Sequence, residues 1–559
     1  MDQLEFPGFF RPELPFTPNY LDLSPNLLSR IDPRYLIQEK HLNSKSEDWF
    51  NSSTTIPDRT CLYAGASSDQ GPHLLRHLSS DERGCFGDNK WLIWRVSQRE
   101  STHLTVYPNH LLDCHTAMYD QERIEALFAP YQHELIDLYF KHIHPSYPIL
   151  GSKRSFCKSR AEGTMPASLL AVVLIHGSYF WHLSSQSEMP LPDRGALQPY
   201  VFSCLTFETR TPNVAVIQAT LLFMQLPARF TRAPNHPGVW SVSTMLMGMV
   251  QDMGLHIEPS AWNITSDECK LRRVLWWAVF VHDKSMAHWL GRPSHIKNND
   301  WNVEPLNLKD FTDDDGRLDV DCISWANSFI ALASLSLVMA DLLDDFYGVR
   351  SNFQTMEGAV AEEKGRFLLG RLHSWREVHT ISRGLVTDAH HFTVQFAAIT
   401  VELSIQRAVL GAKRPVGYQN DFIPHEILDT ISLSLFPLLD SLTHSALLTP
   451  SLWLNYSKGN LSMIGSLLIS LILSSIDDGA LNDRRSALLD FRSRLQILAI
   501  QHSSSHNLEF ALLPLRRLNL IIEEIFGQRS STPRTVTLGV DESEDNLWAS
   551  YRIAFPWED

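Results

Sequence analysis

Two amphipathic helices joined by a short polar elbow are predicted between residues 236 and 305, and this hairpin constrains the fold more than any other feature. Apolar residues recur at spacings of three and four from Val239 to Met253, which indicates a helix with one buried face. Gly254 stands where a helix ends in a left-handed residue, and Leu255 follows where a Schellman ending places its hydrophobic contact. We therefore expect the first helix to end at this glycine.

The second helix of the hairpin has an equally clear start and end. Thr265 and Glu268 stand three positions apart, as in a capping box. An apolar stripe follows, and Trp276 and Trp277 enlarge it. The Gly-Arg-Pro sequence at 291–293 ends the helix, because proline lacks an N–H and has a fixed φ. The segment therefore predicts a helical hairpin with a large aromatic core face.

Helical periodicity continues over most of the chain, whereas strand-like alternation is rare after residue 120. An apolar stripe runs from Ile124 to Tyr139, and KWLIWRVSQRESTHLTVYP at 90–108 favours one or two strands. We expect an all-α fold: a large irregular multi-helix domain, with short strands in the N-terminal region and disordered termini. The further helical patterns span residues 167–182, 213–225, 325–346, 362–376, 388–409, 427–447, 461–476, 484–502 and 507–525.

Composition divides the chain into four regions. We predict a poorly ordered segment at 1–56, a mixed region at 57–118, a helical domain at 119–527 and an acidic–aromatic tail at 528–559. The formal net charge of −15 argues against a general nucleic-acid surface. The 7 cysteines are scattered without a C-x-x-C pair, which favours reduced thiols and gives no local zinc site.

The search for reactive or metal-binding groups favours structural roles throughout. His73 and His77 have helical spacing beside Asp69, but no further ligand is specified. His142 and His144 point to different sides of a helix and lack an acidic or thiol partner, so we expect them to pack in the core. Nucleophile elbows, phosphate-binding loops and zinc-protease motifs are absent from the sequence. We predict a non-enzyme without catalytic, cofactor or metal residues.

The most hydrophobic segment, residues 461–476, is shorter than the roughly 20 residues of a membrane span. Serines repeat along it every four residues and give one small-residue face. We expect a buried helix packed closely against a neighbour, and no membrane association. The serines are Ser462, Ser466, Ser470 and Ser474.

The C-terminal tail alternates acids with aromatic residues. Six acids lie between Asp541 and Asp559. This composition is typical of activation segments, in which acids keep aromatic side chains solvated until a coactivator groove binds them. Docking of the aromatic residues on the chain's own domain is an equally open interpretation. The aromatic residues are Trp548, Tyr551, Phe555 and Trp557.

Three separated segments carry a family resemblance. They read YFKHIHPSYPIL at 139–150, VQDMGLHIEPSAW at 250–262 and RRVLWWAVFVHDKSMAHWLGRPSHIKNNDWNVEP at 272–305. In this order they resemble the regulatory middle homology region of fungal zinc-binuclear-cluster transcription factors. The resemblance covers roughly residues 120 to 400, and GASSDQGPHLLRHL at 65–78 is similar to a segment ahead of this region in fungal nitrogen-utilisation activators. The matching positions are His144, Pro145, Pro148, Gly254, Leu255, His256, Arg273, Trp276, Trp277, Asp283, Gly291, Arg292 and Pro293.

The resemblance implies a fungal regulator of RNA polymerase II transcription, located in the nucleus or alternatively in the cytoplasm. The family's six-cysteine zinc cluster is absent from this sequence, so no zinc cofactor is expected. The chain is then a cluster-less relative or a fragment without its DNA-binding module. Its expected partners are transcription-machinery or DNA-binding proteins, with indirect contact to DNA.

Two further expectations concern the hairpin itself. Six tryptophans crowd around it and could line a pocket for a small-molecule effector, or simply form core and rim. Asp283 and Arg292 are expected to form an ion pair near the Gly-Arg-Pro turn. A helical small-molecule-binding protein or enzyme on the same scaffold is the alternative function. The six tryptophans are Trp240, Trp262, Trp276, Trp277, Trp289 and Trp301.

Overall fold

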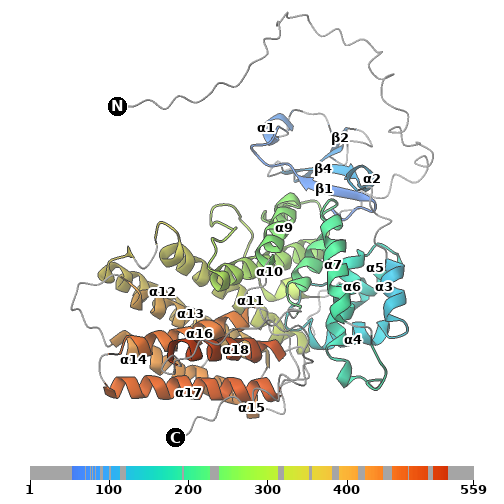
Figure 1. The fold of residues 1–559 in the computed structure, drawn as a ribbon. Coiled ribbons are helices and arrows are strands. Elements are labelled where there is room, and N and C mark those ends of the chain that lie inside the picture. The colour runs from blue at the N-terminus through green and yellow to red at the C-terminus, as the bar shows by residue number, and fades with distance from the viewer. Residues whose placement is uncertain are drawn as a thin grey trace, which may run out of the picture. The chain divides into compact units, whose positions relative to one another are not determined.

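Helices dominate the computed structural model of the protein, as the sequence predicts (Figure 1). The predicted poorly ordered segment, up to residue 52, and the tail at 528–559 lie outside the described residues. The structure describes residues 53–113 with short gaps, and then 121–191, 194–226, 238–312, 320–351, 355–379, 389–412, 422–444, 456–475, 478–501 and 508–526.

A four-stranded antiparallel sheet forms the N-terminal region, which is more strand than the sequence predicts. The strand order is β1-β4-β3-β2. The expected strands are β3 and β4, and the shorter β1 and β2 pair along their outer edges. The elements are β1 (Arg59–Tyr63), α1 (Pro72–Leu75), β2 (Cys85–Gly87), β3 (Leu92–Ser97), β4 (Thr102–Pro108) and α2 (Asn109–Leu112).

The predicted apolar stripe from Ile124 to Tyr139 is two helices rather than one. The first ends at Phe128 and the second begins at Gln132, because Pro130 cannot donate the hydrogen bond that would join them. Helix α6 crosses α4 so closely that a Cβ on Gly177 would lie 2.1 Å from Leu135 O. The helices here are α3 (Gln121–Phe128), α4 (Gln132–His142), α5 (Lys153–Ala161), α6 (Ala167–Ser178), α7 (Arg194–Glu208) and α8 (Val214–Phe223).

The predicted hairpin is present and lies at the centre of the helical packing. Its helices are α9 (Val239–Asp252) and α10 (Ser266–Leu290), and the short 3-10 turns η5 (Pro259–Ala261) and η6 (Leu308–Phe311) flank α10. Helix α10 contacts α8, α9, α11 and α16, so segments from both halves of the chain meet on it. Its side chains from Val274 to Lys284 are all buried.

The helices after α10 follow the predicted periodicity closely. Figure 1 shows α16, α17 and α18 stacked beside one another, and these three pack in pairs. Helix α11 continues into a π-helical segment at Leu343–Tyr347, and a second π-helical segment at Ile431–Leu435 joins α14 to α15. The helices are α11 (Val320–Leu342), α12 (Gly358–Val378), α13 (Ala389–Leu410), α14 (Phe422–Thr430), α15 (Phe436–His444), α16 (Ser457–Leu473), α17 (Asp478–Gln501) and α18 (Leu508–Phe526).

The hydrophobic segment at 461–476 is the core helix α16, as expected, but its close packing does not use the serines. Ser462 and Ser466 are half-buried, Ser470 is exposed, and each hydroxyl donates to a carbonyl of the preceding turn. The leucines and isoleucines form the buried face instead, and Gly459 lies against the Trp289 ring. Burial of apolar area therefore outweighs the small-residue pattern here.

A different helix satisfies the length and composition of a membrane span. Ile323–Tyr347 is long and apolar enough, and 67% of its apolar window is buried inside the protein. Core helices of globular proteins share these properties. The five cysteines whose side chains the structure describes are free thiols.

Candidate functional site

The elbow of the hairpin begins with a left-handed glycine, as predicted. Gly254 has a φ of 63°, and the Leu255 N–H donates to Val250 O at 3.0 Å, which is the longer hydrogen bond of a Schellman motif. A Cβ at Gly254 would lie 3.3 Å from both the Trp262 ring and Tyr63 Cβ. The glycine therefore permits the turn and also the close approach of strand β1.

Thr265 caps the start of helix α10, but the predicted capping box is only half formed. The Thr265 hydroxyl accepts a hydrogen bond from the Glu268 N–H at 3.3 Å. The Glu268 carboxylate accepts from the Thr54 N–H, at 3.1 Å to each oxygen, and from the Thr54 hydroxyl. In a local capping box, the Glu268 carboxylate would accept a hydrogen bond from the Thr265 N–H. Here it binds Thr54 instead, which lies more than 200 residues earlier in the chain.

Arg272 completes a buried ionic cluster one turn after Glu268. Its guanidinium donates to Glu268 Oε1 at 3.2 Å, to Thr54 Oγ1 at 2.6 Å and to Met253 O at 3.1 Å. The Arg272 and Glu268 side chains are 2% and 9% exposed, and the Trp262 ring lies 4.7 Å from the guanidinium carbon. A buried charge is costly unless it is paired and hydrogen-bonded, so this cluster fastens the segment at Thr54 to the hairpin.

Sequence reasoning missed this cluster, although part of its signal is visible. Glu268 and Arg272 stand four positions apart in the correct order for a helical ion pair. Both fall at the edge of the apolar stripe, which indicates that they face inward. The third member, Thr54, could not be found by spacing because the fold alone brings it there.

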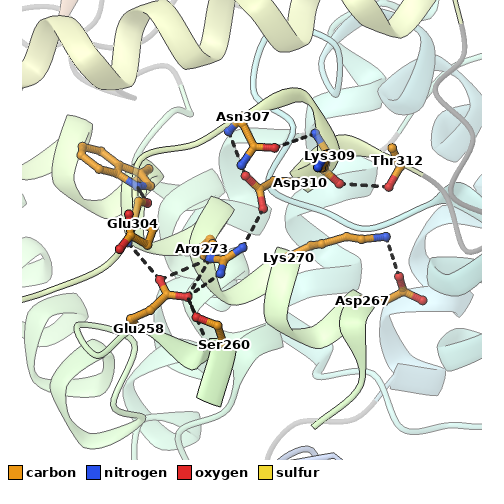
Figure 2. A network of polar contacts seen from close by, with 11 residues as sticks. Glu258, Ser260, Asp267, Lys270, Arg273, Glu304, Asn307, Lys309, Asp310 and Thr312 are labelled. Atoms are coloured by element: carbon orange, nitrogen blue, oxygen red, sulfur yellow. Dashed lines mark hydrogen bonds and ion pairs between the residues drawn. The ribbon is translucent and has the colours of Figure 1, made fainter. Parts of the chain in front are cut away.

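Arg273, the residue after Arg272, connects the elbow with the chain after α10 (Figure 2). Its Nη2 lies 2.5 Å from Glu258 Oε1, and its Nη1 lies 3.2 Å from Asp310 Oδ1. Glu258 Oε2 also accepts from the Glu304 N–H at 2.9 Å. Arg273 is one of the motif positions, and the structure gives it a positioning role for three separate segments.

The electrostatics of this network favour the ionised pair. Burial alone would raise the pKa of Glu258, but the Arg273 guanidinium, the Ser260 hydroxyl and the Glu304 N–H hold it below its ordinary value of 4.5. Hydrogen bonding to Glu258 raises the pKa of Arg273. Both groups are therefore charged at neutral pH.

Asp283 organises the turn after α10, but its predicted ion pair with Arg292 does not form. Asp283 is 1% exposed, and its oxygens accept from the backbone N–H groups of His295 and Ile296 at 3.0 and 3.1 Å. The Ser294 hydroxyl donates to it at 2.6 Å, and His295 Nδ1 lies 2.9 Å away. Arg292 is exposed, because Gly291 turns the chain outward with a φ of 61°.

Lys284 is buried beside Asp283 and supports the same turn. Its ammonium donates to Ile296 O and to the Ser294 hydroxyl, both at 2.5 Å, and lies 3.6 Å from Asp283 Oδ2. Burial lowers the pKa of Lys284, and the neighbouring carboxylate opposes that shift. The Phe280 ring lies 5.0 Å from the ammonium.

The six tryptophans divide among several contacts rather than around one pocket. Trp276, Trp277 and Trp301 pack with Phe280 at ring distances between 5.3 and 6.5 Å. The others contact different partners: Trp262 contacts Arg272, Trp289 contacts Gly459 and Trp240 stacks on His295 at 4.3 Å. Trp262, Trp276 and Trp277 are buried and the other three are half-buried, so the set forms core and rim.

The N-terminal motif residues also pack structurally. His144 lies between Phe140 and Trp325, at ring distances of 5.1 and 5.8 Å, and burial lowers its pKa to about 4. Pro145 and Pro148 follow the end of α4, where the chain turns away from the helix. His256, in the elbow, meets the Tyr63 ring edge-on at 5.2 Å. A regulatory role for these positions stays a prediction.

The chemistry that this site can perform is positioning. Among the residues the structure describes, there is no group of three or more His, Cys, Asp or Glu side chains that could hold a metal ion. The buried carboxylates of the hairpin are bound to arginine, lysine or backbone N–H groups. Such groups hold segments together and are not poised for proton transfer.

Comparison with known proteins identifies the domain. Residues 136–377 match the family described as the fungal specific transcription factor domain. The matched range contains the whole hairpin and the His144 turn. This part of the chain is therefore similar to that family, in agreement with the motifs at 139–150, 250–262 and 272–305.

Individual relatives carry names of the same kind. A transcriptional regulatory protein of Schizosaccharomyces pombe is 28% identical over 51% of this chain and 44% of its own length. The transcriptional activator DAL81 of Saccharomyces cerevisiae is 25% identical over 64% and 41%, and the nitrogen assimilation transcription factor nit-4 of Neurospora crassa is 26% identical over 43% and 24%. The chain thus spans less than half of each relative. No solved structure matches it.

We predict that the Arg272 cluster contributes strongly to stability. Arg272→Met leaves Glu268 buried without its cation and should cost about 3–5 kcal/mol. Glu268→Gln combined with Arg272→Met should recover much of this loss, because a glutamine oxygen still accepts from Thr54. Lys270→Met is the control, since it removes a more exposed pair with Asp267 and should cost less than about 1 kcal/mol. Thermal and urea unfolding measure these changes. An Arg272→Met loss no larger than that of Lys270→Met would contradict the assignment.

A pH dependence follows from His144. Its folded pKa of about 4 lies below the ordinary 6.5, so the unfolded chain binds a proton that the folded chain does not. Stability from this residue is complete above about pH 6.5 and falls as the pH drops towards 4. His144→Phe should therefore flatten the decline of Tm over this range. His133→Phe, an exposed change on the preceding helix α4, should leave the slope unchanged. Equal slopes for wild type and His144→Phe would refute this prediction.

Proposed function

We propose that this protein regulates RNA polymerase II transcription through protein contacts of its helical domain. The observation that carries the proposal is the match of residues 136–377 to the fungal specific transcription factor domain. The motif residues of that domain support it, because they build one buried and extensively paired hairpin. A relative named as a transcriptional activator is similar over 64% of this chain.

A non-enzymatic role fits the same observations. The relatives are named as regulators, and the hairpin's polar groups are used in structural pairing. We further propose that contact with DNA is indirect, or is made by a module other than residues 53–526. The net charge of −15 supports this, because proteins that bind nucleic acid directly usually present a basic surface. The nucleus is the expected location, with the cytoplasm as alternative.

A reporter experiment tests the regulatory role. The full chain fused to an unrelated DNA-binding domain should change expression of a reporter that carries the matching DNA site, relative to the DNA-binding domain alone. Arg272→Met should weaken the change in proportion to its loss of folded protein, and Lys270→Met should not. A fusion that is expressed, folded and nuclear but leaves the reporter unchanged would contradict the proposal. Specific promoter binding by the purified chain alone would contradict indirect DNA contact.

A small-molecule effector is a second candidate function, favoured by two buried indole N–H groups. Trp276 Nε1 and Trp301 Nε1 have no hydrogen-bond partner within the part of the chain that the structure describes, although both are buried. The two rings are 5.7 Å apart. An effector with a hydrogen-bond acceptor between them would raise Tm, and Trp301→Phe should remove that rise while keeping the packing. A metabolite screen by thermal shift in which no compound distinguishes the two proteins would remove this candidate.

A further inference from the structure

The two C-terminal helices expose large aliphatic side chains on a shared outer surface. Leu489 and Ile500 of α17 are 56% and 65% exposed, and Leu520 of α18 is 63% exposed. The helices pack against each other along their length. Exposed aliphatic residues gathered on adjacent helices mark surfaces that bind another segment or protein.

Three arginines lie among these apolar residues. They are Arg485 and Arg492 on α17 and Arg516 on α18. None of the three forms an ion pair with any residue in the described ranges. Arg494, which points to the other side of α17, pairs with Asp440 at 2.8 Å. The outer surface therefore has cationic groups that are still available to an anionic partner.

A hydrogen bond from Arg492 of α17 to α18 places the exposed residues of the two helices on one surface. Its Nε donates to Asn519 Oδ1 at 2.7 Å, across the seam between the helices. The guanidinium is half-buried, and burial lowers its pKa because no carboxylate compensates for the lost water. A desolvated cation of this kind is a ready site for a carboxylate.

Helical geometry groups the rest around this contact. Positions 485, 489, 492, 496 and 500 follow one another at spacings of three and four, so they lie on one face of α17. On α18, Arg516 stands three positions before Asn519 and four before Leu520, so it neighbours both on that helix. We call this surface the outer face, defined by Arg485, Leu489, Arg492, Ile500, Arg516 and Leu520.

The chain that follows α18 has the complementary chemistry. From Asp541 to its end it contains six acids and one arginine, together with four aromatic residues. Trp548 lies about 20 residues beyond the end of α18, and a chain of that length reaches up to about 70 Å. Helix α18 is only about 28 Å long. The tail can therefore return along the whole outer face.

We propose that the acidic–aromatic segment 541–559 binds the outer face of α17 and α18 within the same molecule. Its carboxylates would pair with the three arginines, and its aromatic side chains would cover Leu489, Ile500 and Leu520. The sequence left activation segment and docked peptide open for this tail, and the charge and apolar pattern of the outer face favours docking. If the proposed regulatory function holds, docking would compete with coactivator binding to the same aromatic residues.

Photo-crosslinking in the full chain tests the proposal without any transcription assay. A photoreactive phenylalanine analogue replaces Phe555, and crosslinked peptides are identified by mass spectrometry. We expect a crosslink within one molecule to peptides that contain residues 485–500 or 516–520. The yield of this crosslink should fall about tenfold in the triple variant Arg485→Glu, Arg492→Glu and Arg516→Glu, because three surface charge pairs are lost together. High salt should reduce it in the wild type.

Matched variants separate docking from misfolding. Arg154→Glu, Arg350→Glu and Arg366→Glu change the charge equally at exposed positions elsewhere and should leave the crosslink intact. Replacing Asp541, Glu542, Glu544 and Asp545 by their amides leaves the helices untouched and should weaken it. Crosslinks to other helices, the absence of any crosslink, or crosslinks only between molecules that increase with concentration would each overturn the proposal. The reporter result does not enter this decision.

Discussion

Helix α10 buries four charged side chains, and their need for partners determines how the segments around this helix are arranged. Glu268, Arg272, Asp283 and Lys284 lie on one helix, and each is at most 9% exposed. Buried charges require partners, and α10 cannot supply enough of them from its own turns. The partners come from the segment at Thr54 and the turn at 294–296, while Arg273 draws in the elbow and Asp310. Segments far apart in the chain are thereby fixed to a single helix.

This arrangement holds the segments around α10 in fixed positions. The buried ionic clusters of α10 also bind other segments, so moving the segment at Thr54 or the turn after α10 would leave a buried charge with fewer partners. The helices around α10 are therefore held in one packing arrangement. Surfaces without such ion pairs can bind other groups. The outer face of α17 and α18 is one of these, because its arginines have no carboxylate among the described residues. The charges of α10 are paired, so they fix the positions of neighbouring segments. The arginines of the outer face are not in ion pairs among the described residues, so they can bind an anionic partner.

Much of the fold could be predicted because its signals are local. Gly254 and Gly291 end their helices in the left-handed conformation that a short turn needs, and the periodicity of the helices from α11 to α18 is visible in the sequence. Predictions failed where a distant group competed with a local one. Glu268 binds Thr54 rather than completing its capping box, and Asp283 binds the 294–296 backbone rather than Arg292. The serine face of α16 turned outward because the opposite face buries more apolar area.

The helical class, the hairpin with its glycine endings and the family resemblance of the motifs can all be inferred from the amino-acid sequence. These features depend on local patterns in the sequence, namely the spacing of apolar residues and the backbone preferences of individual residue types. Only the tertiary structure decided which charges are buried and what pairs with them. Thr54 and Arg272 are 218 positions apart, and no periodicity relates them. Ion pairing in a low-dielectric interior acts through space, so the fold had to bring these groups together before their partnership could be recognised.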